Sequence, residues 1–354
     1  MRVLELKLQN YRNIEDITIN PCEEMNVICG ENAQGKTNLL EAIWLFTGAK
    51  SFRGAKDAEF IKFGEEKAKL ELKFLSEGIE KEAKIEIEER RKAFLQGNAL
   101  KSPSALAGSF NAIVFSPSDL SLLNDGPSVR RKFLDTAIGQ LYPSYIEILR
   151  KYVRAVAQRN QIIKDLKYDS SLSIMLDVFE EEIAEEGKKL IILRKKYIER
   201  INEFLPSVYG GLSCGKERLD TEYFCKVSEE KLKQALFDSR KEDMFKGSTS
   251  VGPHRDDLEF KINGVSARSF GSQGQKRSIA LALKLAEAEV IKKVVGECPT
   301  FILDDVMSEL DPNRQEYILN HIKGMQVFLS CCDPSNVKQL KAGKIFKVSN
   351  GGIV

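Results

Sequence analysis

The stretch that decides the fold is Gly30-Glu31-Asn32-Ala33-Gln34-Gly35-Lys36-Thr37. It matches every fixed position of the pattern GxxxxGK(S/T), the phosphate-binding loop, or P-loop, of nucleotide-binding proteins. An apolar run, residues 26–29, precedes it and a helical pattern, residues 39–44, follows it. A chance glycine-rich turn would lack this strand–loop–helix context, so the sequence predicts a true P-loop.

The chemistry of a P-loop explains why these residue types recur at this spacing. Glycines let the backbone turn tightly, so that successive N–H groups converge on phosphates at the positive end of a helix. Lys36 is predicted to place a compact charge between the β- and γ-phosphates, and the Thr37 hydroxyl to coordinate Mg²⁺. Residues 30–37 therefore predict ATP and Mg²⁺ as the ligands.

A second motif, Thr300-Phe301-Ile302-Leu303-Asp304-Asp305, reads as an apolar strand that ends in two carboxylates. Asp304 is predicted to hold Mg²⁺ and Asp305 to orient the attacking water, which makes both catalytic residues together with Lys36. Many P-loop ATPases carry Glu where Asp305 stands, and Asp is one methylene shorter. The alternative is an acidic strand end at an ordinary turn, but the P-loop favours the catalytic interpretation.

A third motif, Ser269-Phe270-Gly271-Ser272-Gln273-Gly274-Gln275, directly precedes a predicted helix. Ser and Gly residues at a helix N-terminus form an anion-binding cap. The P-loop already cradles the phosphates within the chain, so a second cap finds a nucleotide only on a two-fold partner. Ser272, Gly274 and Gln275 are therefore predicted to contact the ATP of a second copy; the alternative is an ordinary helix cap.

Composition sets limits on the other function classes. Charged residues make up 30% and hydrophobic residues 42% of the 354 positions, as in globular proteins. The start of the chain lacks the pattern of a signal peptide and no apolar run is long enough for a membrane span, so a cytoplasmic protein is expected. Seven scattered cysteines and two histidines make a disulfide framework, a zinc site or a His-based triad poor hypotheses. The net charge of +2 leaves a DNA partner possible but does not argue for one.

The hydrophobic patterns divide the chain into three parts. Residues 1–125 are rich in alternating strand patterns and contain the P-loop, and residues 246–354 alternate strand and helix, so together they predict an α/β domain. Residues 126–245 have helical periodicity and are predicted to be an insertion with a short antiparallel arm. Its two helices of roughly 25–30 residues would each be about 40–45 Å long.

The order of these motifs along the chain resembles that of a known family. The order GENAQGKT, GSQGQ, FILDD and then Ser308-Glu309-Leu310-Asp311 is similar to the SMC-like branch of ABC ATPases. Further stretches resemble the RecF family of DNA replication and repair proteins: LKLQNYRN (6–13), KSFR (50–53), VFSPSDLSLL (114–123), GPSVRRKFLD (126–135) and VGPHRDDL (251–258). The implied fold is an ABC-type P-loop ATPase head with a mixed sheet, plus an inserted helical arm domain.

The resemblance also implies a function. It predicts a weak, DNA-stimulated ATPase of recombinational repair, replication restart and the SOS response, which dimerises head-to-tail on DNA with ATP and is released by hydrolysis. The implied partners are a second copy, duplex DNA and single-strand/duplex junctions bound without sequence preference, and mediators that load recombinase at single-strand gaps. Arg12 and Asn13 match an element that approaches the nucleotide in SMC-like heads, with a polar turn as the alternative.

Two departures from the wider ABC pattern leave roles open. VFSPSD stands where a Q-loop Gln is expected, and Ser330-Cys331-Cys332 stand where a switch His is expected. Water positioning and γ-phosphate sensing therefore need other residues, which the sequence does not identify.

Charged segments outside the motifs have plainer interpretations. His254 and Arg255 follow Gly-Pro and predict a structured turn rather than direct chemistry. Arg130, Arg131 and Lys132 predict a solvated helix face that pairs with Asp135, with DNA phosphate contacts as the alternative. The basic run 188–196 beside the acidic residues 180–186 predicts a solvated arm.

Three other functions compete with the first. A transporter nucleotide-binding subunit would not carry the helical insertion or the RecF-like segments. An SMC-type chromosome structural protein needs a long coiled coil, for which residues 38–268 leave no room. A non-hydrolysing scaffold that uses ATP only to hold a dimer together stays open because Asp305 replaces the usual Glu.

Overall fold

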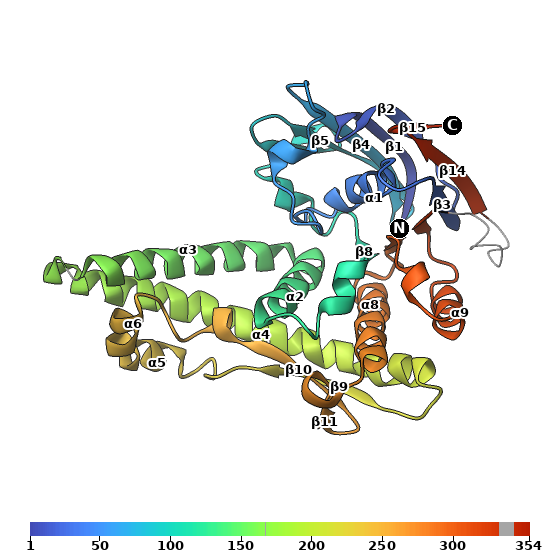
Figure 1. Cartoon of the computed structure of the whole chain (residues 1–354). Coiled ribbons are helices and arrows are strands. Elements are labelled where there is room, and N and C mark those ends of the chain that lie inside the picture. The colour runs from blue at the N-terminus through green and yellow to red at the C-terminus, as the bar shows by residue number, and fades with distance from the viewer. Residues whose placement is uncertain (167, 333–342) are drawn as a thin grey trace. The chain divides into compact units, whose positions relative to one another are not determined.

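The computed structural model describes residues 1–166, 168–332 and 343–354. The chain forms two compact units, which Figure 1 shows with their element labels. The first unit comprises residues 1–121, 207–216 and 277–354, and the second comprises residues 122–206 and 217–276. None of the helices within the described ranges is both long enough and apolar enough to cross a membrane.

An antiparallel sheet forms one layer of the first unit. Its strand order is β2-β1-β4-β5-β6-β7. The side chains of β4 alternate between buried and half-buried positions, so the apolar residues of the alternating pattern face the core. The six strands are β1 (Arg2–Tyr11), β2 (Ile14–Ile19), β4 (Ala68–Ser76), β5 (Ile79–Ile87), β6 (Arg91–Leu95) and β7 (Asn98–Ala99).

The second sheet of this unit carries the nucleotide motifs. Its order is β15-β14-β3-β13-β12-β8, and all neighbours are parallel except the β14–β15 hairpin. The predicted mixed sheet is therefore confirmed. Every residue of β3 is buried, as expected for a strand covered on both faces. The strands are β3 (Met25–Cys29), β8 (Ala112–Phe115), β12 (Thr300–Leu303), β13 (Val327–Cys331), β14 (Gly343–Ser349) and β15 (Gly352–Ile353).

Helix α1 (Lys36–Leu45) follows the P-loop, and one hydrophobic core joins this helix to both sheets. Helix α8 (Gln273–Val295) contributes mostly to this unit, and α9 (Pro312–His321) begins at Pro312 because the Asp311 side chain caps it. Short 3₁₀ turns complete the chain at Asp57–Phe60, Pro103–Leu106, Pro117–Ser121, Ser170–Leu172, Pro253–Arg255 and Met307–Glu309.

The second unit is built on long helices. In Figure 1, α3 and α4 run side by side as an arm, and α5 and α6 lie against it. Helix α3 has 23 residues and α4 has 40, so the predicted inserted arm is present with one helix longer than predicted. The helices are α2 (Pro127–Leu141), α3 (Pro143–Asp165), α4 (Ser173–Leu212), α5 (Leu232–Asp238), α6 (Arg240–Lys246) and α7 (Ala267–Phe270).

A small sheet explains why the units divide differently from the predicted parts. Its strands β9 (Leu219–Phe224), β10 (Asp257–Ile262) and β11 (Val265–Ser266) are antiparallel. Because β9 pairs with β10 across the predicted boundary at 245/246, residues 246–276 fold with the helices. Residues 207–216, which follow Pro206 within and beyond α4, belong instead to the first unit.

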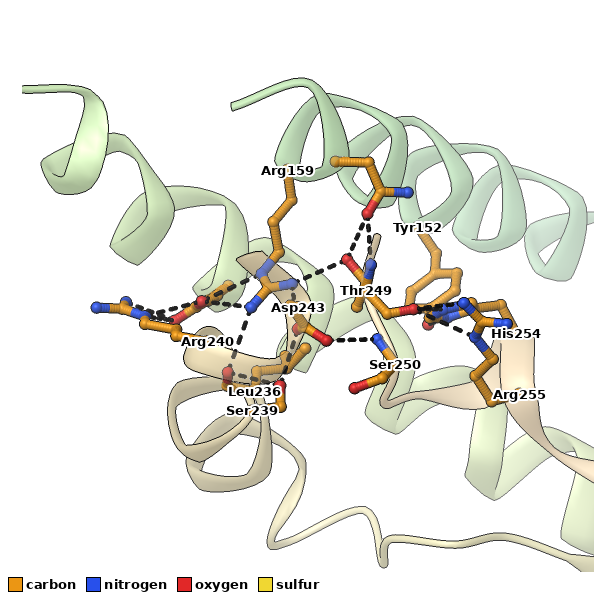
Figure 2. Close-up of polar contacts among 12 residues, drawn as sticks. Tyr152, Arg159, Leu236, Ser239, Arg240, Asp243, Thr249, Ser250, His254 and Arg255 are labelled. Carbon is orange, nitrogen blue, oxygen red and sulfur yellow. Dashed lines mark hydrogen bonds and ion pairs between the residues drawn. The ribbon is translucent and has the colours of Figure 1, made fainter. Parts of the chain in front are cut away.

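Buried arginines hold the second unit together. Arg159 is fully buried and contacts Glu180 at 2.9 Å. It also contacts Asp243 at 2.7 Å, as Figure 2 shows. Arg194 is also buried and bonds to Asp135 at 2.7 Å. The prediction of a solvated arm is therefore wrong for Glu180 and Arg194, because both side chains are buried. Each of these buried charges is matched by an opposite charge.

Arg130 also differs from its prediction. Its guanidinium makes a two-pronged contact with Asp257, at 2.6 and 2.9 Å, and donates to the carbonyl oxygens of Leu122 and Asp125. The predicted solvated helix face is wrong at this position, and Asp135 pairs with Arg194 instead. A carboxylate more than a hundred residues away in sequence cannot be identified from helical spacing.

The predicted structured turn at His254 is confirmed. His254 lies in the 3₁₀ turn Pro253–Arg255, and its Nε2 donates to the Thr249 carbonyl, so Nδ1 accepts from the Tyr152 hydroxyl at 2.5 Å (Figure 2). Burial lowers the pKa of His254 to about 4, which keeps the ring neutral.

Replacing Arg159 with Leu is expected to lower the free energy of unfolding by about 3–5 kcal/mol, because Asp243 and Glu180 would stay buried without their main counter-charge. Urea denaturation followed by far-UV circular dichroism measures the change. Lys233→Ala removes an exposed ion pair with Glu181 and should cost far less, because water screens exposed charges. Equal costs in the two variants would contradict the assigned role of Arg159.

Candidate nucleotide site

The P-loop connects β3 to α1, and two of its glycines are required by close approaches. A Cβ on Gly30 would lie 2.3 Å from the Val348 carbonyl oxygen of β14. Gly35 has a φ of 115°, and a Cβ there would lie 2.9 Å from the Asn13 side-chain oxygen. Gly30 therefore excludes any larger residue because backbone lies in the way, whereas Gly35 is favoured by its left-handed backbone conformation.

Lys36 begins α1 and its side chain is buried to 6% exposure. Its Nζ donates to the carbonyl oxygens of Gly30, at 2.6 Å, and Glu31, at 3.0 Å. The Cys332 sulfur lies 3.5 Å from the same nitrogen. The loop thus holds one compact positive charge against its own backbone at the N-terminal end of a helix.

Asp304 connects the two nucleotide motifs. The Thr37 hydroxyl donates to Asp304 Oδ1 at 2.9 Å, and the Ser330 hydroxyl donates to the same oxygen at 2.9 Å. Strand β13 lies between β3 and β12, which places Ser330 between the P-loop and Asp304. Burial raises the pKa of Asp304, and these two hydrogen bonds oppose the rise.

Asp305 is exposed and has an unusual backbone conformation. Its φ is 53°, and its N–H donates to Ser330 Oγ at 2.8 Å. Asp and Asn enter this left-handed region more easily than residues with longer side chains. The backbone therefore offers a physical reason for Asp in place of the Glu found in many P-loop ATPases.

Asn13 and Arg12 lie beside the P-loop and α1, in line with their predicted neighbourhood. The Asn13 amide donates to the Gln34 carbonyl oxygen at 3.1 Å. Arg12 Nη2 donates to Glu41 at 2.7 Å, and Glu41 is fully buried in α1. Arg12 therefore braces the helix through a partly buried ion pair, while Asn13 contacts the loop itself.

Several contributors were missed by sequence reasoning. Arg53 donates to the Asn38 side chain at 3.0 Å and lies 3.9 Å from Glu41, and Glu41 also accepts from the Ser51 hydroxyl at 2.5 Å. The only sequence signal for them was the RecF-like stretch KSFR. Ser330 stood in the place of the expected His, but nothing in the sequence indicated its contacts.

The terminal hairpin also braces the P-loop. The Gly351 N–H donates to the Gln34 carbonyl oxygen at 3.1 Å, and the Asn350 N–H donates to the Gln34 side chain at 2.5 Å. Residues more than three hundred positions apart thus fix one side of the loop.

The signature residues belong to the second unit, where they form a capping box at the start of α8. The Ser272 N–H donates to Gln275 Oε1 at 2.7 Å, and the Gln275 N–H donates to Ser272 Oγ at 3.2 Å. Ser272 is exposed, and Gly274 lies within the first turn of the helix. The structure thus brings Lys36, Thr37, Asp304 and Asp305 together in one unit, and keeps Ser272, Gly274 and Gln275 together in the other.

Known proteins match this chain over nearly its whole length. The family model described as RecF/RecN/SMC N terminal domain matches residues 2–352. A protein of Clostridium acetobutylicum named DNA replication and repair protein RecF is 40% identical over 362 residues, covering 100% of this chain and 99% of that protein. A protein with the same name from Thermoanaerobacter sp. is 38% identical over 370 residues, with the same coverage.

Solved structures agree with the sequence matches. A structure described as the recombination mediator protein RecF-ATP in the RecFOR pathway has a TM-score of 0.92 and 36% identity, covering 100% of this chain and 97% of that one. The corresponding RecF-ATPrS structure has a TM-score of 0.93 and 36% identity, covering 99% and 97%. A SmcHead structure bound to the C-winged helix domain of ScpA has a TM-score of 0.59 at 17% identity, with coverage of 100% and 97%, and supports the fold alone.

Replacing Asp304 with Asn is expected to raise the free energy of unfolding at pH 7.5 without nucleotide or metal. A raised pKa means that the folded chain holds this proton more tightly than the unfolded chain does, so stability increases as pH falls through that pKa and the ionised carboxylate costs stability at neutral pH. Urea denaturation across pH measures the effect. Asp311→Ala, which removes the α9 cap, should instead lower stability by about 1 kcal/mol. A destabilised Asp304→Asn would contradict this account.

Proposed function

Because the chain belongs to the RecF family of DNA replication and repair proteins, we propose that it is a DNA-binding ABC-type ATPase that dimerises head-to-tail when it binds ATP. The observation that carries the proposal is the contact between Thr37 and Asp304, which joins the two nucleotide motifs in one unit. A relative solved as RecF-ATP supports ATP as the nucleotide.

The residues present fit Mg²⁺. The Thr37 hydroxyl and the Asp304 carboxylate are hard oxygen ligands, which Mg²⁺ prefers, and they already lie 2.9 Å apart. The ion would supply charge neutralisation at the β- and γ-phosphates. Lys36 binds the same phosphates from the P-loop side, and the N–H groups at the start of α1 add partial positive charge.

Hydrolysis requires that a water molecule be oriented toward the γ-phosphate. Asp305 is exposed beside Asp304 at the end of β12, and its carboxylate accepts a proton or a hydrogen bond from that water. Ser330 fixes this arrangement, because it bonds to the Asp304 side chain and to the Asp305 backbone. Ser330 therefore acts as a positioning residue where the switch His is absent.

The second half of the site comes from a partner copy. The capping box at Ser272–Gln275 begins α8, and the N-terminal end of a helix carries partial positive charge, which suits a phosphate. In a two-fold dimer each copy receives this cap from the other. ATP would therefore join the copies, and hydrolysis would release them.

DNA and the other partners follow from the family. Relatives named as DNA replication and repair proteins, and one solved as a recombination mediator of the RecFOR pathway, support a role with DNA. We extend the proposal to sequence-independent binding of duplex DNA and of single-strand/duplex junctions. The proposal also includes a cytoplasmic role beside recombination mediators that load recombinase at gaps. A second candidate, a scaffold that binds but does not hydrolyse ATP, is favoured only by the short Asp305 side chain.

The first test is solution mass with and without ATP–Mg²⁺. The wild type should shift from 39.9 kDa to twice that mass, Lys36→Arg should stay monomeric, and Asp305→Asn should persist as a dimer because it binds without turnover. Steady-state phosphate release distinguishes the ATPase from the scaffold. A mass that never responds to ATP would reduce the signature residues to a helix cap.

Mixing two inactive variants tests whether the site is shared. Lys36→Ala lacks the P-loop charge and Ser272→Arg blocks the cap, so each alone should hydrolyse ATP poorly. Their heterodimer contains one complete site, and an equimolar mixture should regain roughly a quarter of the wild-type rate if copies pair at random and the sites act independently. No recovery, with both variants still folded, would contradict the shared site.

A further inference from the structure

The outer face of α3 has a pattern that the nucleotide chemistry does not use. Positions Arg150, Arg154, Ala157, Gln161 and Lys164 recur at helical spacing, and all five are exposed. Figure 1 shows α3 along one edge of its unit, with α4, α5 and α6 on the other side. The opposite face of the helix is buried and includes Tyr152 and Arg159.

The cations on this outer face lack close counter-charges. Among the described residues, no carboxylate lies within 4.0 Å of the Arg154 or Lys164 side-chain nitrogens. Arg150 lies 3.7 Å from Glu147, and both side chains are about two-thirds exposed, so that contact is weak.

The lysines of the antiparallel sheet in the first unit show the contrast. Lys69 lies 2.6 Å from Glu71, and Lys73 lies 3.3 Å from Glu5. Each of these two lysines therefore has a carboxylate beside it.

The neighbouring helix carries the opposite charge. The exposed residues Asp177, Glu181 and Glu185 of α4 are acidic. Arg240 of α6 pairs with Asp177, and Lys233 of α5 pairs with Glu181. The arm is therefore basic on its α3 side, whereas the N-terminal part of α4 is acidic and has its own counter-charges. Further along α4 the exposed residues Lys188 and Lys196 are basic.

We propose that the α3 basic face, defined as Arg150, Arg154 and Lys164, binds the phosphate backbone of duplex DNA. The inference rests on the proposed DNA-binding function and assigns a surface to it. From Arg150 to Lys164 the helix rises about 21 Å, which matches about six base pairs of duplex. Arginine and lysine side chains both donate to phosphate oxygens, and neither needs to read a base.

The spacing fits a regular polyanion. Side chains four residues apart stand about 6 Å apart along the helix, and the short Ala157 leaves room between the two ends of the face. Cations without protein partners release condensed counter-ions from DNA without first breaking an ion pair. The N-terminal part of α4 would have to break such pairs and would repel DNA with its remaining carboxylates.

The test is fluorescence anisotropy of a labelled duplex titrated with protein in ATP–Mg²⁺ over a series of salt concentrations. The double variant R150Q/R154Q should bind roughly tenfold or more weakly near 0.1 M salt, and the slope of log K against log salt should fall in magnitude by about 2. The matched control K188Q/K196Q removes two exposed cations from α4 and should keep the wild-type slope.

Solution mass with ATP, measured on the same samples, separates the two levels of the proposal. If the wild type dimerises with ATP yet binds no duplex at low salt, the proposed DNA function fails and the α3 basic face fails with it. If the wild type binds and R150Q/R154Q binds equally well, the surface assignment alone fails, and an acidic protein becomes the better partner for this face. Equal losses in both double variants would also overturn it, because affinity would then follow net charge.

Discussion

The site depends on one oxygen atom, Oδ1 of Asp304, which accepts hydrogen bonds from both Thr37 and Ser330. These residues come from the P-loop, from the end of β12 and from β13, so the bonds form only when three parallel strands are in register. Burying this carboxylate costs free energy, since the environment raises its pKa. The two hydroxyl groups offset part of that cost. The left-handed backbone at Asp305 is held by the same Ser330, which ties the proposed metal ligand and the proposed water-orienting residue to a single side chain.

The P-loop keeps its shape because distant segments support it. Asn13 and the backbone of Asn350 and Gly351 all contact Gln34, and Val348 leaves space only for a glycine at position 30. An anion site made of backbone N–H groups needs this support, because its donors must already point at the phosphates before binding. Rigid neighbours therefore contribute to affinity without contacting the ligand.

Local patterns predicted the parts of the fold that depend on neighbouring residues. The apolar run before Gly30, the helix after Thr37 and the strand Thr300–Leu303 are each specified within a short window, and all three are present. Ser330, the Arg130–Asp257 pair and the β9–β10 pairing were not predicted, because each joins residues far apart in sequence. The boundary predicted at 245/246 differs from the division into compact units for the same reason. Helical periodicity ends before the strand that completes the second unit.

Burial separates two roles that arginine has within one helix. Arg159 faces inward, where Asp243 and Glu180 neutralise it, whereas Arg150 and Arg154 face outward without a strong partner. The inward ion pairs cost desolvation energy and fix the geometry of the arm, so the outward charges are held on a rigid helix. The net charge of +2 hides this arrangement, because carboxylates elsewhere on the chain balance these cations in the total without lying beside them. A nearly neutral composition is therefore compatible with a surface that attracts a polyanion, provided that one face leaves its cations unpaired.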